Sequence, residues 1–179
     1  MGRENQGVFQ THSRYQVLPR VLCFVTYGHE VLLLRGGPHK RLWAGLYNGV
    51  GGHVEASEDI RAAVLREVKE ETGLDAGDVR LRGVVHVDVD DPIRGVLFFV
   101  FTATAPTKQV VSMQDGSLEW IAAQDLPFAQ MVEDLPVILP AVLAMGPADP
   151  PFFATYSYDA DDRLVISFSG GGDLPKELS

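Results

Sequence analysis

The chain has 179 residues, of which 46% are hydrophobic and 22% are charged, and this suits one globular domain with a sizeable core. The formal net charge of −9 argues against a general nucleic-acid binder, although acidic side chains with a divalent cation can still bind a phosphorylated small molecule. No apolar run reaches the roughly 18–20 residues of a membrane span, and the polar start of the chain does not resemble a signal peptide.

The first half of the chain predicts a hairpin followed by a glycine-rich strand. Val- and Leu-rich segments over 17–25 and 30–34 predict the hairpin. Cys23, the single cysteine, is expected to be a buried thiol in a cytoplasmic protein. The segment 42–54 holds four glycines and predicts a short strand between tight turns. For the whole chain we expect a flexible leader over 1–14, a single domain over 15–169 and a loose tail over 170–179.

The clearest helix is predicted over residues 57–72. Ser57 is expected to be its N-cap, because a serine hydroxyl can accept from an otherwise unpaired amide of the first turn. Glu58 and Asp59 place negative charge at the positive end of the helix dipole. Gly73 is expected to end the helix as the C′ residue.

The second half predicts further strands and one more helix. The segments 80–89 and 95–104 predict a strand pair, and 118–122 predicts a short strand. Residues 135–145 predict a helix that Pro140 should kink or restart. A last hairpin is predicted over 156–158 and 164–168, and the sequence leaves open whether it pairs with the main sheet or packs over the pocket.

Three glutamates of the predicted helix share one face. An α-helix advances about 100° per residue, so Glu67 lies beside both Glu70 and Glu71. Clustered carboxylates repel one another, which is easiest to understand if a cation lies among them. Oxygen ligands without nearby His or Cys favour Mg²⁺, or Mn²⁺ in its place, over Zn²⁺. The alternative is a solvated acidic face with Arg66 and Lys69 as surface partners.

These glutamates belong to a longer pattern. Gly52 is followed after five residues by Glu58, and after seven more by Arg66-Glu67-Val68-Lys69-Glu70-Glu71-Thr72-Gly73-Leu74. At average residue frequencies, the pattern arises by chance at on the order of 10⁻⁹ to 10⁻¹⁰ per start position. It resembles the Nudix box at every defined position, and the wider resemblance to that family spans about residues 15–145.

The resemblance implies an α/β fold, an α/β/α sandwich around a mixed sheet, and a Mg²⁺-dependent pyrophosphohydrolase that cleaves a nucleoside diphosphate linked to a second group. The implied metal ligands are Glu67, Glu70, Glu71 and the carbonyl of Gly51. The residues implied in catalysis are Glu58, Arg66, Glu67 and Glu70, with Glu58 and Arg66 orienting the cluster. Arg66 could also pair with Glu70 at i, i+4.

Members of the family often use one more acidic residue from a loop outside the box. Asp115 is the candidate for this catalytic role, because it lies in the polar loop five residues before Trp120. Glu119 is the second choice. A carboxylate in a surface loop is the alternative reading of Asp115.

Several stretches resemble the oxidised-purine nucleoside triphosphate diphosphatases within the family, over 47–55, 119–120, 125–128 and 131–134. In that group an Asn at the position of Asn48 and an acidic residue near that of Asp134 contact the purine edge, so both are candidates for substrate binding. Asn offers a donor and an acceptor, and a buried Asp can select a tautomer. Alternatively, Asn48 is a turn residue and Asp134 is a charge at a helix N-terminus. The sequence departs from the group at 135–136, where Leu and Pro replace polar residues.

Other polar and aromatic residues near the box have less specific interpretations. Trp43 and Tyr47 could stack on a base, but core packing is the expected role. His53 is expected to lie on the surface. Residues 39–41 form a small basic patch that is expected to be a solvated loop.

Three functions remain open. The first is hydrolysis of a nucleoside triphosphate, with an oxidised purine nucleotide as the specific case, to the monophosphate and pyrophosphate. The second is cleavage of ADP-ribose, a nucleotide sugar or a dinucleoside polyphosphate by the same centre. The third is a catalytically silent Nudix module that binds nucleotides, although such modules usually lose box glutamates that are all present here. In each case the partner is a small-molecule nucleotide, with no nucleic acid and no membrane.

Overall fold

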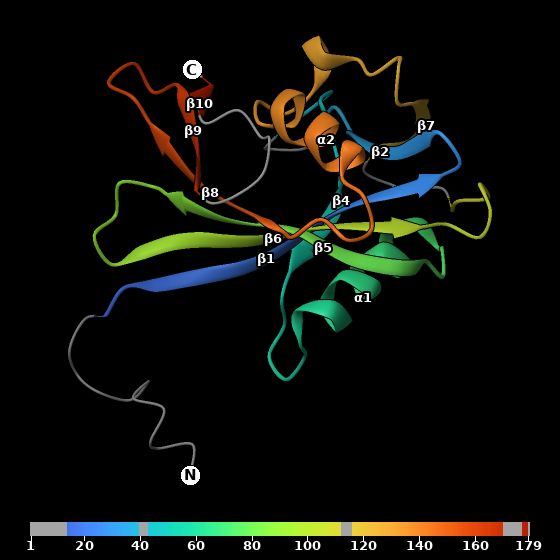
Figure 1. Cartoon of the computed structure of the whole chain (residues 1–179), viewed down its shortest axis with the longest axis horizontal. Helices are drawn as coiled ribbons and strands as arrows, with labels where there is room; N and C mark the ends of the chain where they lie inside the picture. Colours follow the sequence, from blue (N-terminus) through green and yellow to red (C-terminus); the bar gives the residue numbers. More distant parts are fainter. Residues whose placement is uncertain (1–13, 40–42, 112–115, 170–176, 179) are drawn as a thin grey trace.

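The computed structural model describes residues 14–39, 43–111, 116–169 and 177–178. Its strands are β1 (Gln16–Tyr27), β2 (Glu30–Gly36), β3 (Tyr47–Asn48), β4 (Val50–His53), β5 (Gly77–Asp88), β6 (Arg94–Thr104), β7 (Gly116–Ala122), β8 (Phe152–Tyr158), β9 (Leu164–Ser169) and β10 (Glu177–Leu178). The helices are α1 (Ile60–Thr72), the short 3₁₀ helix η2 (Phe128–Gln130) and α2 (Leu135–Ala144). Within these residues, one mixed sheet lies between α1 and α2, which confirms the expected α/β sandwich (Figure 1).

The sheet is organised around β1. Its strand order is β10-β9-β8-β5-β6-β1-β2-β3, while β4 also pairs with β1 and β7 with β2. One edge of β1 runs parallel to β6, and its other edge pairs first with β4 and then with β2. The chain crosses from the β2 branch to the β1 branch between Asn48 and Val50. The residues that the sequence singles out around Gly51 therefore lie at a fork in the sheet.

Each face of the sheet packs against one helix. On one face, Val64 and Val68 of α1 are buried with the apolar side chains of β1 and β6, and Ile60 is partly buried beside them. On the other face, Leu135, Ile138 and other apolar residues of α2 pack on the central strands. The apolar stripe of α1 is therefore buried against the sheet.

The first helix begins later than the sequence predicted. Asp59, not Ser57, is the N-cap, because its Oδ1 accepts hydrogen bonds from the backbone amides of Arg61 (2.8 Å) and Ala62 (2.9 Å). Ser57 lies in a turn at φ 73°, away from the extended backbone that an N-cap adopts. Gly73 ends the helix at φ 75°, as expected from its tolerance of the left-handed region.

The second helix and the last hairpin resolve two further expectations. α2 continues through Pro140 as a single helix, so the predicted restart there is wrong. A proline removes only one backbone donor, and Ile138, Leu139 and Val142 bury α2 on both sides of it. The hairpin β8–β9 pairs with the main sheet, because β8 runs parallel to β5. Residues 177–178 of the expected loose tail pair with β9, and residues 1–13 lie outside the described part.

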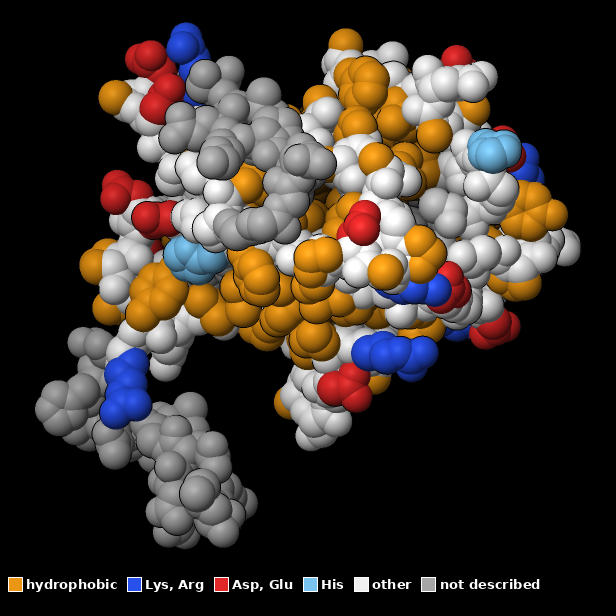
Figure 2. Space-filling model, viewed as in Figure 1, with side chains coloured by type: hydrophobic (Ala, Val, Ile, Leu, Met, Phe, Trp, Pro, Cys, Tyr) orange, Lys and Arg blue, Asp and Glu red, His pale blue; other side chains and the backbone are white. Residues whose placement is uncertain are grey.

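Part of the sheet face on the α1 side stays open to solvent. Phe153 of β8 points away from the α2 core and is 50% exposed, and Val17 of β1 is also exposed. Figure 2 shows hydrophobic side chains gathered across the middle of the molecule in this view. In the ranges that the structure describes, no helix combines the length and the apolar character needed to cross a membrane.

Candidate functional site

The carboxylate face of α1 lies against the two glycines of β4. The backbone amide of Gly51 donates a hydrogen bond to Oε2 of Glu71 at 3.1 Å. Next to it, the carboxylate of Glu67 lies over Gly52, where a Cβ would come within 2.4 Å of Oε1. The glycine therefore leaves the space that the carboxylate needs, and the spacing from Gly52 to Glu67 in the sequence has a steric reason.

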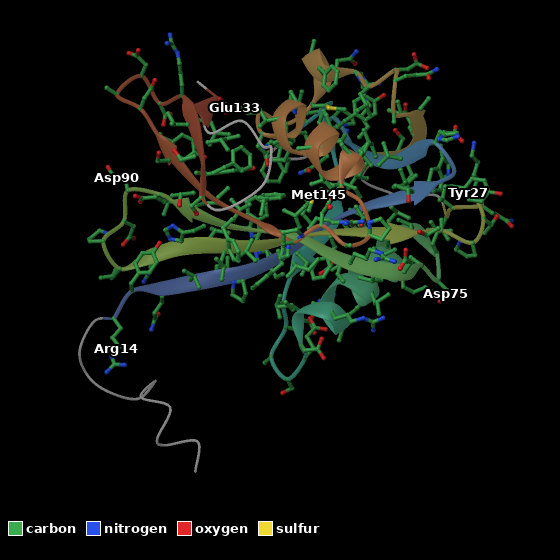
Figure 3. All side chains as sticks on the ribbon, in the orientation of Figure 1. Arg14, Tyr27, Asp75, Asp90, Glu133 and Met145 are labelled. Atoms are coloured by element: carbon green, nitrogen blue, oxygen red, sulfur yellow. The ribbon has the colours of Figure 1, made fainter. Side chains whose placement is uncertain are left out.

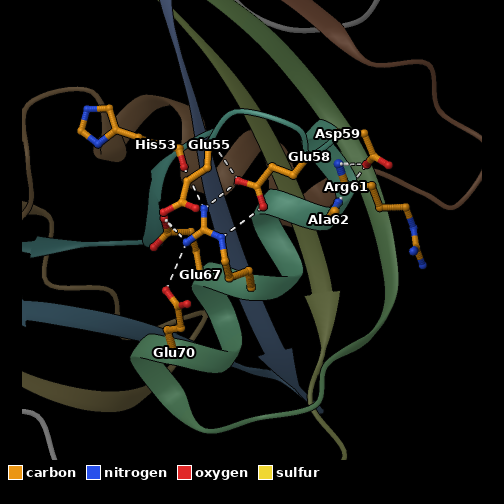
Figure 4. A network of polar contacts seen from close by, with 9 residues as sticks. His53, Glu55, Glu58, Asp59, Arg61, Ala62, Glu67 and Glu70 are labelled. Carbon is orange, nitrogen blue, oxygen red and sulfur yellow. Dashed lines mark hydrogen bonds and ion pairs between the residues drawn. The ribbon is translucent and has the colours of Figure 1, made fainter.

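Arg66 joins the loop before α1 to the carboxylates on the helix, and its partners Glu58, Glu67 and Glu70 are labelled in Figure 4. Its Nε and Nη2 donate to the two oxygens of Glu58 at 3.1 and 2.8 Å, and Nη2 also donates to the carbonyl of His53 at 3.0 Å. Its Nη1 donates to Glu67 at 2.9 Å and to Glu70 at 3.1 Å. The expected pairing of Arg66 with Glu70 is confirmed, and two more carboxylates share the same guanidinium.

The electrostatics of this network keep Arg66 and Glu58 charged. The hydrogen bonds from Arg66 are the largest cause that lowers the pKa of Glu58, and the amide of Glu55 adds to it. In return, Glu58 and then Glu67 raise the pKa of Arg66 above its already high ordinary value. The side chains of Glu58 and Glu67 are largely shielded, whereas that of Glu70 is 60% exposed. Glu70 is therefore the carboxylate of the network that faces solvent.

The donor set suits a hard divalent cation, because it consists of carboxylate oxygens without thiol or imidazole ligands. The three candidate ligands nevertheless do not converge on one point. Glu67 and Glu70 both turn toward Arg66, and Glu71 turns toward the amide of Gly51. Within the described ranges, no three Asp, Glu, His or Cys side chains lie close enough together to hold a metal ion. A bound cation would therefore need the three carboxylates to reorient.

Asn48 and Asp134 lie on segments that the fold brings together. Tyr47 of β3 forms a parallel bridge with Met131, and the amide of Val132 donates to the carbonyl of Tyr47 at 3.0 Å. Asn48 and the chain leading to Asp134 are therefore neighbours across this bridge, although they are far apart in sequence.

The contacts of Asn48 support the turn interpretation in part. Its Oδ1 accepts from the amide of Gly49 at 2.8 Å, so the acceptor side of the amide is used locally. No described residue accepts a hydrogen bond from its Nδ2. The donor side of the side chain thus remains for another partner.

Asp134 does not behave as a helix cap. It occupies the position before α2, but its carboxylate makes no hydrogen bond to the amides of the first turn. Instead, Oδ2 accepts from the hydroxyl of Tyr156 at 3.3 Å. Burial raises the pKa of Asp134 to about 6, against the opposing effect of hydrogen bonds that include the one from Tyr156. Both protonation states of Asp134 are therefore accessible within about one unit of neutral pH.

Tyr156 is a residue of this region that the sequence reasoning missed. It lies on β8, and its ring packs edge-on against Phe98 with centroids 5.5 Å apart. The alternation of buried and exposed residues along β8 could have indicated it, because Phe152, Ala154 and Tyr156 all face the α2 core.

The expectations for the acidic residue outside the box have different outcomes. Asp115 lies outside the described residues, so its role stays a prediction. Glu119 lies on β7 and accepts hydrogen bonds from the hydroxyls of Tyr47 at 2.7 Å and of Ser117 at 3.0 Å. These bonds give Glu119 a structural role beside Tyr47.

The expectations for the aromatic and basic residues near the box also have different outcomes. Tyr47 is buried as expected, with the guanidinium of Arg35 5.3 Å from its ring centroid. Trp43 is 46% exposed, so the expectation of core packing is wrong for it. His53 lies on the surface as expected, where its Nε2 accepts from Arg20 at 3.2 Å. His39 is exposed, whereas Lys40 and Arg41 lie outside the described ranges.

Comparison with known proteins identifies the family. The sequence model of the NUDIX domain matches residues 17–142. The NAD-capped RNA hydrolase NudC of Pseudomonas aeruginosa is 30% identical over 118 residues, which cover 65% of this chain and 40% of that protein. The chain thus spans less than half the length of this relative.

Two solved structures share the fold. The MutT protein from Bacillus halodurans aligns with a TM-score of 0.69 at 23% identity, covering 87% of this chain and 100% of that chain. The NUDIX domain of Shewanella oneidensis NrtR, solved in complex with ADP ribose, aligns with a TM-score of 0.58 at 20% identity, covering 79% and 97%. The domain match covers well over half of the sequence and includes the Arg66 network, so the chain belongs to the Nudix hydrolase family.

Proposed function

We propose that this chain is a Mg²⁺-dependent pyrophosphohydrolase, for which Mn²⁺ can substitute, that converts a nucleoside triphosphate into the monophosphate and pyrophosphate. The observation that carries the proposal is the Arg66 network, which fixes Glu58 and Glu67 beside the glycines of β4. An array of ion pairs on a surface helix would not require a glycine beneath one of its carboxylates. The closeness of Glu67 to Gly52 therefore favours a built site over a solvated acidic face.

The residues that would hold the cation are Glu67, Glu70, Glu71 and the carbonyl of Gly51. When bound, a divalent cation would neutralise charge on the diphosphate oxygens and lower the pKa of a bound water. Nη1 of Arg66 restrains both Glu67 and the solvent-exposed Glu70, and Glu58 anchors Arg66 through both of its oxygens. These contacts gather the glutamates beside β4, so that a cation would have to turn their carboxylates but would not have to bring the three residues together. Asp115 remains the proposed acidic residue outside the box.

Asn48 and Asp134 are proposed to contact the base. The Nδ2 group of Asn48 can donate to an acceptor on a purine edge. Asp134 can accept from a ring N–H as a carboxylate, or donate when protonated, and its pKa of about 6 makes the choice sensitive to the base presented to it. This pairing supports a purine nucleotide, with an oxidised purine as the specific case that the sequence pattern suggests.

A second candidate is a nucleotide whose diphosphate is linked to another group, such as ADP-ribose, a nucleotide sugar or a dinucleoside polyphosphate. The names of the relatives support it, since one is an NAD-capped RNA hydrolase and another was solved with ADP ribose. Because the NAD-capped RNA hydrolase acts on an RNA, the absence of a nucleic-acid partner for this chain stays a prediction. The cytoplasmic location also stays a prediction.

The test is turnover of a substrate panel by the purified chain. Oxidised and normal nucleoside triphosphates, ADP-ribose, nucleotide sugars and dinucleoside polyphosphates would be incubated with Mg²⁺ or Mn²⁺, and the products would be separated by chromatography. Monophosphate and pyrophosphate from a purine triphosphate support the leading proposal. Preference for a linked nucleotide would replace it with the second candidate.

Two variants test the assignment of Glu67 as a metal ligand. Glu67→Gln should abolish turnover at fixed Mg²⁺, whereas Glu30→Gln makes the same chemical change on β2, outside the box, and should leave turnover intact. Full activity in Glu67→Gln would refute the metal assignment. Nucleotide binding without turnover on the whole panel would identify the chain as a silent module.

A further inference from the structure

Arg82 lies in an irregularity of β5 that turns its side chain toward the α2 side of the sheet. The pairing of β5 with β6 matches Leu81 with Phe101 and Gly83 with Val100, which leaves Arg82 as the extra residue of a β-bulge. Bulges commonly redirect a side chain and are frequent next to functional sites. The residue is only 7% exposed, which is unusual for an arginine.

The buried guanidinium has neutral partners. Its Nε donates to the hydroxyl of Thr102, and its Nη1 donates to the carbonyl of Gly146, both at 2.8 Å. No carboxylate among the described residues forms an ion pair with it. Burial, and then the nearby Arg80, lower the pKa of Arg82. Asp149 and Asp78 counter this only weakly through longer-range attraction. A buried charge without an ion pair in direct contact is costly, so this arrangement calls for an explanation.

A cavity of about 290 Å³ opens beside Arg82. One wall is polar and includes the hydroxyl side chains of Thr26, Thr102 and Thr104, and the other wall is the apolar end of α2. Met145, at the end of α2, and Tyr27, between the lining residues Thr26 and Gly28, are labelled in Figure 3. Neither the residues of the Nudix box nor Asn48 and Asp134 line the cavity, so it is separate from the proposed active site.

The acidic residues at the cavity already have cationic partners. Asp78 receives three contacts from Arg80, the shortest at 2.8 Å. Glu30 forms an ion pair with Lys108. Among the described residues, Arg82 is therefore the guanidinium of the lining that forms no direct ion pair, and Asp78 and Asp149 act on it only through longer-range attraction.

We propose that this cavity binds the oxyanion group, phosphate or carboxylate, of a small molecule, with Arg82 as its charged ligand and the threonine hydroxyls beside it. The apolar part of such a molecule would rest on Val142, Leu143 and Met145 at the end of α2. A guanidinium offers five donors in a plane, and two of its nitrogens already have partners here, so the remaining donors can bind an oxyanion. The site does not depend on the proposed hydrolase activity.

The competing explanation is that Arg82 only ties β6 to the end of α2. That role needs the two bonds to Thr102 and Gly146, but it needs neither the cavity nor the rest of the guanidinium. The two explanations differ in one measurable respect. A structural tie gives no saturable response to an added anion, whereas a site does.

The experiment is a titration of the full chain that is monitored by amide NMR. EDTA is present and divalent cations are left out, so that the glutamates of the Nudix box bind no cation. The probes are inorganic phosphate, acetate and hexanoate, each compared with chloride at the same ionic strength. We expect saturable shifts at the amides of Thr26, Gly28, His29 and Thr104 with phosphate or with the carboxylates, and none with chloride. If phosphate binds more tightly than acetate and hexanoate, the ligand is a phosphorylated molecule. If hexanoate binds more tightly than phosphate and acetate, the ligand is a carboxylate with an apolar chain.

Variants decide whether Arg82 is the ligand. Arg82→Lys should weaken binding by about tenfold or more, because an ammonium cannot keep both structural bonds and bind the anion as a fork. If that variant fails to fold, Thr104→Asp places a negative charge at the exposed edge of the cavity and should weaken binding similarly. Thr155→Asp adds the same charge on an exposed strand position outside the cavity and serves as the control. The proposal fails if no probe gives saturable shifts, or if Thr104→Asp and Thr155→Asp bind the anion equally well.

Discussion

The carboxylate of Glu67 fills the space that a side chain at Gly52 would need, since a Cβ there would lie 2.4 Å from Glu67 Oε1. Gly52→Ala should therefore displace Glu67 and lower kcat by about 10²-fold, because small displacements of catalytic groups are costly. Gly77→Ala is the matched control, since a Cβ at Gly77 meets no atom within 4 Å. Steady-state kinetics on the best substrate of the panel would test this. Equal kcat values for the two variants would contradict the steric role of Gly52.

Arg66 is expected to act as a positioning residue. Arg66→Lys keeps the charge but loses the planar fork that binds both oxygens of Glu58, so kcat should fall by about 10- to 100-fold. The substitution should also raise the Mg²⁺ concentration that gives half-maximal activity, because Glu67 and Glu70 lose their common anchor. A variant with lower kcat but an unchanged metal requirement would place Arg66 outside the metal site. Arg163→Lys, at an exposed ion pair, is the control.

Asp134 should make the free energy of unfolding depend on pH. Its pKa is raised from 3.8 to about 6 by burial, so the folded protein binds a proton more tightly than the unfolded chain. The contribution of Asp134 to the free energy of unfolding is therefore largest at low pH. It falls as pH rises from about 4 through 6, and the total decrease is at most about 3 kcal/mol. Asp134→Asn mimics the protonated form, so its stability relative to the parent protein should be higher at pH 8 than at pH 4.

Urea unfolding at both pH values measures this difference. Tyr156→Phe should move the transition to higher pH, because it removes a hydrogen bond that favours the ionised form. If the stability difference between Asp134→Asn and the parent protein is the same at pH 4 and pH 8, the carboxylate is not desolvated as the structure shows.

Asn48 has a local role and a proposed substrate role, and two variants can separate them. Asn48→Asp retains the oxygen that accepts from Gly49 but loses the Nδ2 donor, whereas Asn48→Ala loses both. We expect both variants to lose about 10- to 100-fold in kcat/KM on the preferred purine nucleotide. Only Asn48→Ala should also lower Tm. Equal losses on purine and pyrimidine nucleotides would show that Asn48 does not contact the base.

The N-cap of α1 gives a test of the fold itself. Asp59→Ala should destabilise the protein by about 1 kcal/mol, because two amides of the first turn lose their acceptor. Ser57→Ala should cost less, because Ser57 lies outside the helix. Urea unfolding of both variants compares the two candidates directly, and a larger loss for Ser57→Ala would contradict the cap.

The box and the helix could be predicted because their signals are local. Gly52 lies beneath the carboxylate of Glu67, and Glu58 pairs with Arg66, all within one short stretch of the chain, so their spacing in the sequence reflects their geometry. The N-cap was misplaced for a local reason too, since Ser57 and Asp59 are both good caps and only the backbone conformation separates them.

The features of the fold and of the site that could not be predicted depend on contacts between segments far apart in the sequence. The sequence named Asn48 and Asp134, but the bridge between Tyr47 and Met131 that relates them cannot be read from either segment alone. Nor does the sequence indicate that Arg82 is the extra residue of a bulge, because the register of β5 against β6 decides it. The position of β8 beside β5 likewise depends on pairing between distant segments and cannot be derived from either strand alone.

The parallel register of β1 with β6 imposes an order on assembly during synthesis. The first strand made, β1, pairs along its length with residues 94–104 and cannot complete the centre of the sheet until they have left the ribosome. By then α1 and β4 are also present, whereas Asp134 and Tyr156 are not. The nascent chain thus exposes the glutamates of the network, together with Asn48, before Asp134, so the two residues proposed to contact the base become available at different stages of synthesis.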